Sequence, residues 1–304
     1  MDSPVVTVDG LHKRYGSTVA VEDVSFDVRR GEIFGLLGPN GAGKTTTVEC
    51  LQGLRRADAG ALRILGLDPA RQTQELRRRI GSQLQESALP DRIKVWEALR
   101  LFSSGSDGDT SARLLDEWGL AGKRDATFAG LSGGQRQRLF VALALLGDPE
   151  VVFLDEMTTG LDPSARRVAW QLIETIRDQG TTVVLVTHFM DEAERLCDRV
   201  AIVDRGRVAL MGAPQDLIVQ HAGAVQVLFT AEGVDPAWLR TLSGVTDVRE
   251  RGGAVEVEGE GPILARVAAA LASRGIEPAD LRVERSSLED VFLSVVGARE
   301  GMEG

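Results

Sequence analysis

The sequence predicts an α/β protein with a mainly parallel sheet, followed by a smaller α+β module. Three observations support this prediction. A short apolar run at 32–37 leads through a glycine-rich loop into a helical pattern. Two further apolar runs, at 151–154 and 181–186, each end in polar residues and precede a helix. From residue 225 apolar and polar residues alternate, which is typical of strands in an open sheet.

Length and composition indicate a soluble protein with one large domain, or a large and a small one. The chain has 304 residues, of which 43% are apolar and 26% charged. Its net charge of −10 argues against nonspecific nucleic-acid binding as the main activity. We therefore expect no nucleic-acid partner.

Cysteine content and hydropathy bear on where the protein works. Cys50 and Cys197, the only cysteines, lie in apolar periodic segments, so we expect a reduced, cytosolic protein without disulfides or zinc. No apolar stretch reaches the roughly eighteen residues of a membrane span. Residues 1–4 lack the basic and apolar regions of a signal peptide. If the protein acts at a membrane, we therefore expect another subunit to anchor it there.

The first glycine-rich loop has the spacing G-x-x-x-x-G-K-[ST] of nucleotide-hydrolase phosphate loops. Glycines let backbone amides turn around a phosphate, and the following helix start adds a partial positive charge. Lys44 is expected to reach the outer phosphates, and the Thr45 hydroxyl to ligate Mg²⁺. A chance glycine turn is the competing interpretation, which the flanking strand and helix disfavour. The predicted phosphate contacts are Gly38, Pro39, Asn40, Gly41, Ala42, Gly43, Lys44, Thr45 and Thr46.

Two acids and a histidine follow the two buried strands. A buried parallel strand delivers its last side chains to the carboxyl edge of the sheet, where ligands bind. There Asp155 would hold the Mg²⁺ shell and Glu156 would polarise the attacking water. His188 could bond a γ-phosphate and position that water. Helix caps for the acids and a structural role for the histidine are the alternatives, which the phosphate loop disfavours.

A second glycine motif covers residues 131–135 and opens a helical pattern. Ser132 suits an N-cap, and Gly133 and Gly134 free backbone amides to face an anion. One chain already has a complete phosphate loop, so we expect this motif, including Gln135, to close the nucleotide site of a partner chain. The alternative is a structural glycine turn.

Together these residues resemble the nucleotide-binding domain of ABC transporters over about residues 4–220. The resemblance is specific because five motifs occur in the family's order and spacing. By resemblance, Gly38–Thr46 is the Walker A loop, Ser132–Gln135 the signature motif, Val151–Asp155 the Walker B strand, and Glu156 the catalytic glutamate.

The resemblance assigns four further residues. Tyr15, the only tyrosine, looks like the aromatic that stacks on adenine, although a half-buried edge aromatic is the alternative. Gln85 looks like the glutamine that senses Mg²⁺ and couples to the membrane subunit; it is preferred to Gln83 because a Gln-Glu pair is the usual context. Asp162 lies in the D-loop, and His188 matches the switch histidine.

The family binds two ATP molecules, with Mg²⁺, between two head-to-tail domains. The resemblance thus implies a homodimer of nucleotide-binding domains, a polytopic membrane permease as partner, and a cytoplasmic location at the inner membrane face. Residues 287–293 resemble the tail of daunorubicin-resistance-like exporter ATPases, which favours export of a drug, lipid or other small hydrophobic cargo. Met157 departs from the family's usual proline, which should loosen that turn.

The expected domains are an ATPase domain at 1–222, with a helical subdomain at about 72–148, and an accessory domain at 223–304. The accessory domain has the order βαββαβ-α of a ferredoxin-like module. Binding or dimer support is its expected role, with a regulatory ligand sensor as the alternative. For the whole chain, the competing class is a soluble, non-transport ABC ATPase acting on ribosomes or DNA. A small-molecule kinase or GTPase is disfavoured by the signature motif.

Overall fold

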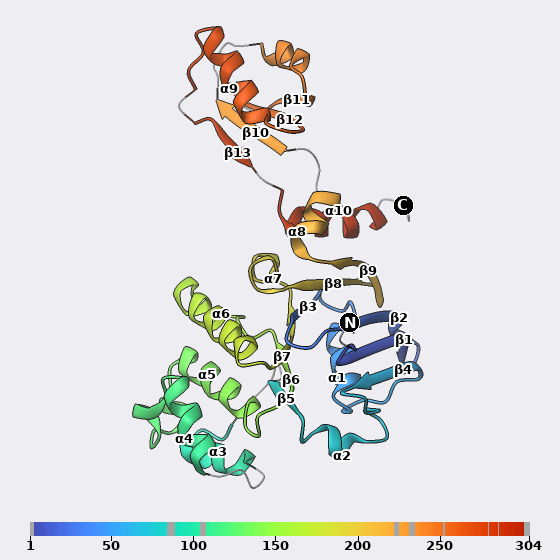
Figure 1. Cartoon of the computed structure of the whole chain (residues 1–304), viewed down its shortest axis with the longest axis vertical. Helices are drawn as coiled ribbons and strands as arrows, with labels where there is room; N and C mark the ends of the chain where they lie inside the picture. Colours follow the sequence, from blue (N-terminus) through green and yellow to red (C-terminus); the bar gives the residue numbers. More distant parts are fainter. Residues whose placement is uncertain are drawn as a thin grey trace. The chain divides into compact units, whose positions relative to one another are not determined.

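The computed structural model describes residues 3–83, 89–103, 108–221, 225–230, 235–251, 253–278, 280–284 and 286–300. The chain folds into two compact units, Met1–Pro214 and Gln215–Gly304 (Figure 1).

The first unit contains a nine-stranded sheet in the order β4-β1-β2-β9-β8-β3-β7-β6-β5. Neighbouring strands from β8 to β5 in this order are parallel, whereas β1 pairs antiparallel with β2 and β4. Its strands are β1 (Val6–Tyr15), β2 (Thr18–Val28), β3 (Ile33–Leu37), β4 (Ala59–Ile64), β5 (Ile80–Gln83), β6 (Val151–Asp155), β7 (Thr182–Thr187), β8 (Arg199–Asp204) and β9 (Arg207–Gly212).

The strands at the centre of the parallel part are continuous apolar runs because both faces of the sheet are covered. Every residue of β3, β6 and β7 is buried. These three strands lie where the sequence predicts them, and the mainly parallel α/β class is confirmed.

Helices pack beside this sheet (Figure 1). They are α1 (Lys44–Leu51), α2 (Thr73–Leu76), α3 (Val95–Phe102), α4 (Gly108–Glu117), α5 (Gly133–Ala144), α6 (Pro163–Asp178), α7 (Met190–Leu196) and the 3₁₀ helices η1 (Ala121–Lys123) and η2 (Phe128–Gly130).

The stretch expected to be helical, about 72–148, differs in two places. At its start only α2 (Thr73–Leu76) is helical, and the next element is strand β5 (Ile80–Gln83). That strand pairs in parallel with β6, from Ile80 opposite Val151 to Gln83 opposite Leu154. At Gly81 a Cβ atom would collide with the carbonyl oxygen of Ala144. Pairing with a distant strand, and this close approach of α5, therefore determine the conformation of 80–83.

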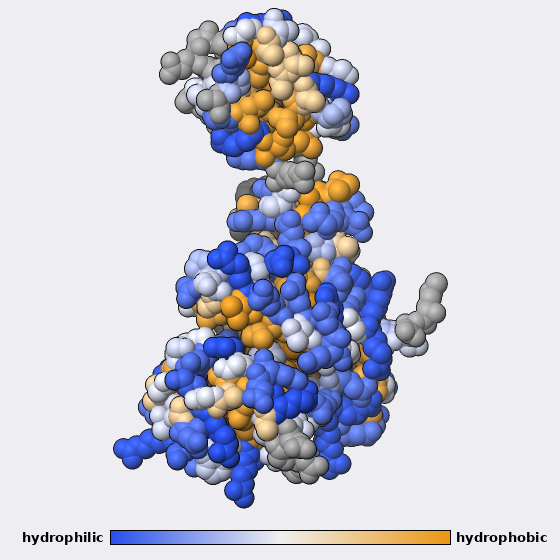
Figure 2. All heavy atoms as spheres, turned by 60° about the vertical axis from the view of Figure 1, so that its left-hand side comes forward, coloured by the Kyte–Doolittle hydropathy of each residue, from blue (hydrophilic) through white to orange (hydrophobic). Residues whose placement is uncertain are grey.

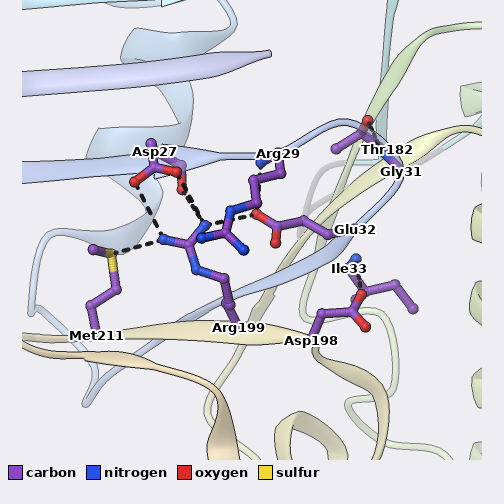
Figure 3. Close-up of polar contacts among 9 residues, drawn as sticks. All are labelled: Asp27, Arg29, Gly31, Glu32, Ile33, Thr182, Asp198, Arg199 and Met211. Atoms are coloured by element: carbon purple, nitrogen blue, oxygen red, sulfur yellow. Dashed lines mark hydrogen bonds and ion pairs between the residues drawn. The ribbon is translucent and has the colours of Figure 1, made fainter. Parts of the chain in front are cut away.

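A charged cluster joins β2, β8 and the turn before β3 (Figure 3). The Arg199 guanidinium donates to Asp27 Oδ2 at 3.1 Å and to Glu32 Oε1 at 3.2 Å. Glu32 also accepts from the backbone N–H of Arg29 at 2.7 Å. Burial raises the pKa of the Glu32 carboxyl, and the hydrogen bond from Arg29 and the charge of Arg199 oppose that rise.

The second unit is the predicted ferredoxin-like module. Its four strands form an antiparallel sheet in the order β11-β12-β10-β13. The first strand is therefore central and pairs with the third and the fourth, as the βαββαβ order requires. The connection after the first strand is a 3₁₀ helix. The elements are β10 (Val225–Thr230), η3 (Pro236–Thr241), β11 (Val245–Arg251), β12 (Ala254–Gly259), α9 (Ile263–Ser273), β13 (Arg282–Glu284) and α10 (Leu288–Glu300), preceded by α8 (Pro214–His221).

Surface hydropathy agrees with the charged composition. Figure 2 shows hydrophilic residues over most of the visible face of the larger unit, with hydrophobic residues in smaller groups. Among the described helices, none combines the length and apolar character that a membrane span requires.

Candidate active site

The glycine-rich loop connects the end of β3 to the start of α1. Gly38 and Gly43 have φ angles of 152° and 101°, which residues with a Cβ rarely adopt. A Cβ at Gly38 would collide with the carbonyl oxygen of Val203, and one at Gly43 with that of Ala20. Only glycine fits at these two positions, so the tight loop depends on them.

Lys44 is buried against the loop that precedes it. Its Nζ donates to the carbonyl oxygens of Gly38 at 2.8 Å and Pro39 at 2.9 Å. Burial lowers the pKa of Lys44, and the neighbouring carboxylates of Glu156 and Asp155 oppose that change. The loop thus holds an ammonium group beside the two acids that end and follow β6.

Asp155 ends β6 and is almost fully buried. Burial raises its pKa to about 6, with a further rise from Glu156 that Lys44 opposes. Within the described part of the chain, its Oδ1 is buried without a hydrogen-bond partner. A buried carboxylate oxygen that lacks a donor fits a bound Mg²⁺, which prefers oxygen ligands. Thr45, exposed in the first turn of α1, offers a hydroxyl oxygen.

Glu156 and His188 meet across two neighbouring strands. His188 Nδ1 lies 3.1 Å from Glu156 Oε1. Glu156 has a φ of 47°, a conformation that is uncommon outside glycine, and its N–H donates to Val186 at 2.9 Å. This hydrogen bond to β7 fixes the backbone of Glu156. The Glu156 carboxylate points at His188, which follows β7.

Two other predicted residues cap helices. The Ser132 hydroxyl accepts from Gln135 N at 3.3 Å, and the Gln135 side chain accepts from Ser132 N at 3.0 Å, which is a capping box. The Asp162 carboxylate accepts from the N–H groups of Ser164 and Ala165, both at 2.9 Å, at the start of α6. The structure therefore shows the N-cap function of Ser132, with Gly133 and Gly134 in the first turn of α5.

Tyr15 ends β1 with its side chain 40% exposed. The cationic groups of Lys13 and Arg55 lie 5.5 Å and 5.8 Å from its ring centroid. The ring is therefore open to solvent at the end of the strand. Gln85 falls outside the described residues.

The structure thus brings four predicted residues together: Lys44, Asp155, Glu156 and His188. No hydrogen bond or ion pair among the described residues connects Ser132, Asp162 or Tyr15 to them.

One residue close to this site was missed in the sequence. Glu192, in α7, is a fully buried carboxylate. It lies four residues before buried Leu196 and beside buried Ala193. A charged residue on the apolar side of a short helix is the signal that could have indicated it.

Known proteins are similar to this chain over nearly its whole length. A family model described as ABC transporter matches residues 21–159. The Nod factor export ATP-binding protein I of Ralstonia nicotianae is 39% identical over 97% of this chain and 94% of its own length. The daunorubicin resistance ATP-binding protein DrrA3 of Streptomyces coeruleorubidus is 39% identical over 98% of this chain and 97% of its own. A solved ATP binding subunit of an ABC transporter superposes with a TM-score of 0.65, at 32% identity, over 71% of this chain and 92% of that one.

The chain belongs to the ABC transporter family. Within that family it is an ATP-binding subunit of the exporter type, an ATPase whose hydrolysis is coupled to transport. The resemblance seen in the sequence is confirmed.

Proposed function

We propose that this subunit powers the export of a drug, lipid or other small hydrophobic cargo through a separate polytopic permease. The observation that carries the proposal is the Glu156–His188 pair beside Lys44 and Asp155, which fits hydrolysis of a bound nucleotide. The names of the relatives, which include a Nod factor exporter and a daunorubicin resistance protein, support export of such a cargo.

In this proposal the loop from Gly38 to Thr46 binds the phosphates of ATP through its backbone amides. The ammonium group of Lys44 contacts the outer phosphate oxygens. It either breaks its hydrogen bonds to the two loop carbonyls or keeps them and uses its remaining N–H. Thr45 and Asp155 would hold Mg²⁺, with Gln85 as the third predicted ligand. When bound, Mg²⁺ supplies positive charge that offsets the charge of the phosphates.

Glu156 orients the attacking water, and His188 contacts the γ-phosphate. The water oxygen attacks the γ-phosphorus in line, the bond to the bridging oxygen of ADP breaks, and the proton of the water passes to the Glu156 carboxylate. Little covalent chemistry is required of the protein, so positioning and charge stabilisation account for catalysis.

A second copy of the chain completes the site. Ser132, Gly133, Gly134 and Gln135 of one copy face the γ-phosphate bound by Lys44 of the other, and Asp162 lies at the same interface. This assignment is supported by the exposed position of Ser132 at the N-terminus of α5. Tyr15 stacks on the adenine.

The subunit works on the cytoplasmic face of the membrane, held there by the permease. Residues 1–222 form the ATPase domain and 223–304 an accessory domain that supports binding or dimerisation. No nucleic acid takes part. The competing class, a soluble ABC ATPase acting on ribosomes or DNA, finds no support in a chain with net charge −10.

The test is a pull-down of tagged Glu156→Gln protein from detergent-solubilised membranes of its own cell, with ATP present. Recovery of a polytopic membrane protein supports transport. Recovery of ribosomal or DNA-repair proteins, or of the bait alone, overturns it.

A further inference from the structure

Glu192 is a buried carboxylate to which the proposed mechanism gives no role. Its side chain is 0% exposed. Oε1 accepts from the indole Nε1–H of Trp170, in α6, at 3.1 Å. A buried carboxylate costs free energy unless its oxygens are satisfied, so its presence in this core needs a reason.

The surroundings of Glu192 indicate that reason. Burial raises its pKa, and the hydroxyls of Thr187 and Thr158 and the indole of Trp170 oppose that rise. Thr187 ends β7 and directly precedes His188. Thr158 follows Glu156 by two residues. Hydroxyls from both segments that carry the catalytic pair therefore favour the charged form of this one carboxylate.

The contact with Thr158 is incomplete in this structure. Thr158 is fully buried, and its Oγ1 and Glu192 Oε2 are both buried without a hydrogen bond in the described part of the chain. The Thr158 hydroxyl favours the charged form of Glu192, but no hydrogen bond joins the two groups in this structure. A buried donor and a buried acceptor are thus both left unpaired. The Thr187 hydroxyl, by contrast, already accepts from Phe189 N at 3.0 Å, so its hydrogen is available to the carboxylate.

We propose that Glu192 is a positioning residue for hydrolysis: it holds Thr158 and Thr187 together and thereby sets the geometry of Glu156 and His188. The Thr158 hydroxyl donates to Glu192 Oε2 in the arrangement that hydrolyses ATP. The 156–162 segment, which also carries Asp162, is then fixed against the end of β7. This inference rests on the roles proposed above for Glu156 and His188.

The test compares two substitutions at Thr158 in the full-length chain. Thr158→Val removes the hydroxyl but keeps the shape, whereas Thr158→Ser keeps the hydroxyl. We expect Thr158→Val to lower kcat about tenfold or more with little change in nucleotide Kd, and Thr158→Ser to retain kcat. Glu192→Gln should also lower kcat, and adding it to Thr158→Val should lower kcat little further, because both changes remove one interaction.

A matched control is available on β7. Thr182 is also fully buried, and its hydroxyl accepts from Gly31 N at 2.9 Å at the opposite end of that strand (Figure 3). Thr182→Val should lower Tm but leave kcat at the wild-type value. The Thr182→Val control thus distinguishes a general loss of stability from a loss of the positioning of Glu156 and His188.

Two results would overturn the inference: wild-type kcat in Thr158→Val, or an equal loss of kcat in Thr182→Val. Glu192→Gln could fail to fold. The comparison of Thr158→Val with Thr158→Ser therefore tests the role of Glu192 without that variant. Glu156→Gln is measured alongside, so that failure of the proposed site can be told apart from failure of the role of Glu192. Wild-type turnover in Glu156→Gln would overturn the site roles, whereas its loss together with normal turnover in Thr158→Val overturns only the role of Glu192.

Discussion

His188 Nδ1 and Glu156 Oε1 lie 3.1 Å apart, although 32 residues separate them in the chain. The two residues follow the neighbouring parallel strands β7 and β6, which pair from Val151–Thr182 to Asp155–Val186. The register of two buried strands thus sets the distance between an acid and an imidazole. Rigid strands are suited to hold such a pair at the edge where nucleotide phosphates bind.

Glu156→Gln is expected to keep ATP binding and to lose hydrolysis by orders of magnitude. The amide keeps the shape of the side chain but is a poor acceptor for the proton of the attacking water. Phosphate release measured beside nucleotide affinity checks this. Glu150→Gln is the matched control, because Glu150 lies just before the other end of β6 and pairs with Arg79 at 2.7 Å. Turnover of Glu156→Gln near that of Glu150→Gln would contradict the role of Glu156.

Lys44→Ala is expected to weaken nucleotide binding itself. The variant removes the one ammonium that the loop carbonyls hold, and charge-assisted contacts to phosphate are among the stronger hydrogen bonds. We expect a loss of about tenfold or more in affinity, measured by titration with a fluorescent ATP analogue. Lys123→Ala, at an exposed position in η1, should bind as the wild type does. Unchanged affinity in Lys44→Ala would rule out its phosphate contact.

The sequence was most informative where one segment suffices to determine the structure. The runs that form β3, β6 and β7 are apolar throughout because these strands are covered on both faces. Strand β5 gave no such signal. It has four residues, Ile80–Gln83, with a glycine and two polar side chains, and only pairing with β6 defines it. For that reason the segment was expected to be part of a helical stretch.

The candidate site was predictable to the extent that its motifs are local. Lys44 belongs to a loop with fixed spacing, and Asp155 and Glu156 to one strand end. The interaction of Glu192 with Thr158 depends on how α7 packs against β3 and β7, which spacing does not reveal. The same holds for Ala20, whose carbonyl oxygen would collide with a Cβ at Gly43.

Both cysteines are expected to resist alkylation in the folded protein. Cys50 and Cys197 are free and buried. Burial raises the pKa of Cys50 to about 11 and that of Cys197 well above its ordinary value of 9.0. Since the thiolate is the nucleophile, only about 0.1% of Cys50 would be reactive at about pH 8. Mass spectrometry after iodoacetamide treatment should show little modification of native protein and complete modification in concentrated guanidinium. Rapid native labelling would contradict the burial of both thiols.

Arg199→Met is expected to destabilise the fold, and by less as the pH falls. Without the guanidinium, Glu32 is left as a buried carboxylate, and removing one partner of a buried pair costs about 3–5 kcal/mol. Burial already raises the pKa of Glu32, and loss of Arg199 removes a charge that opposes the rise.

Because the folded-state pKa lies above the unfolded value near 4.5, the penalty applies in full above the folded pKa and is relieved as Glu32 takes up a proton. The gap in unfolding free energy between wild type and Arg199→Met should therefore be larger at about pH 7.5 than at about pH 5.5. Denaturant unfolding at the two values checks this. Adding Glu32→Gln to Arg199→Met should restore part of the lost stability, because the neutral amide still accepts from Arg29 N and needs no counter-charge. A gap that widens on acidification, or no recovery in the double variant, would show that Arg199 stabilises the sheet through Asp27 and packing instead of through Glu32.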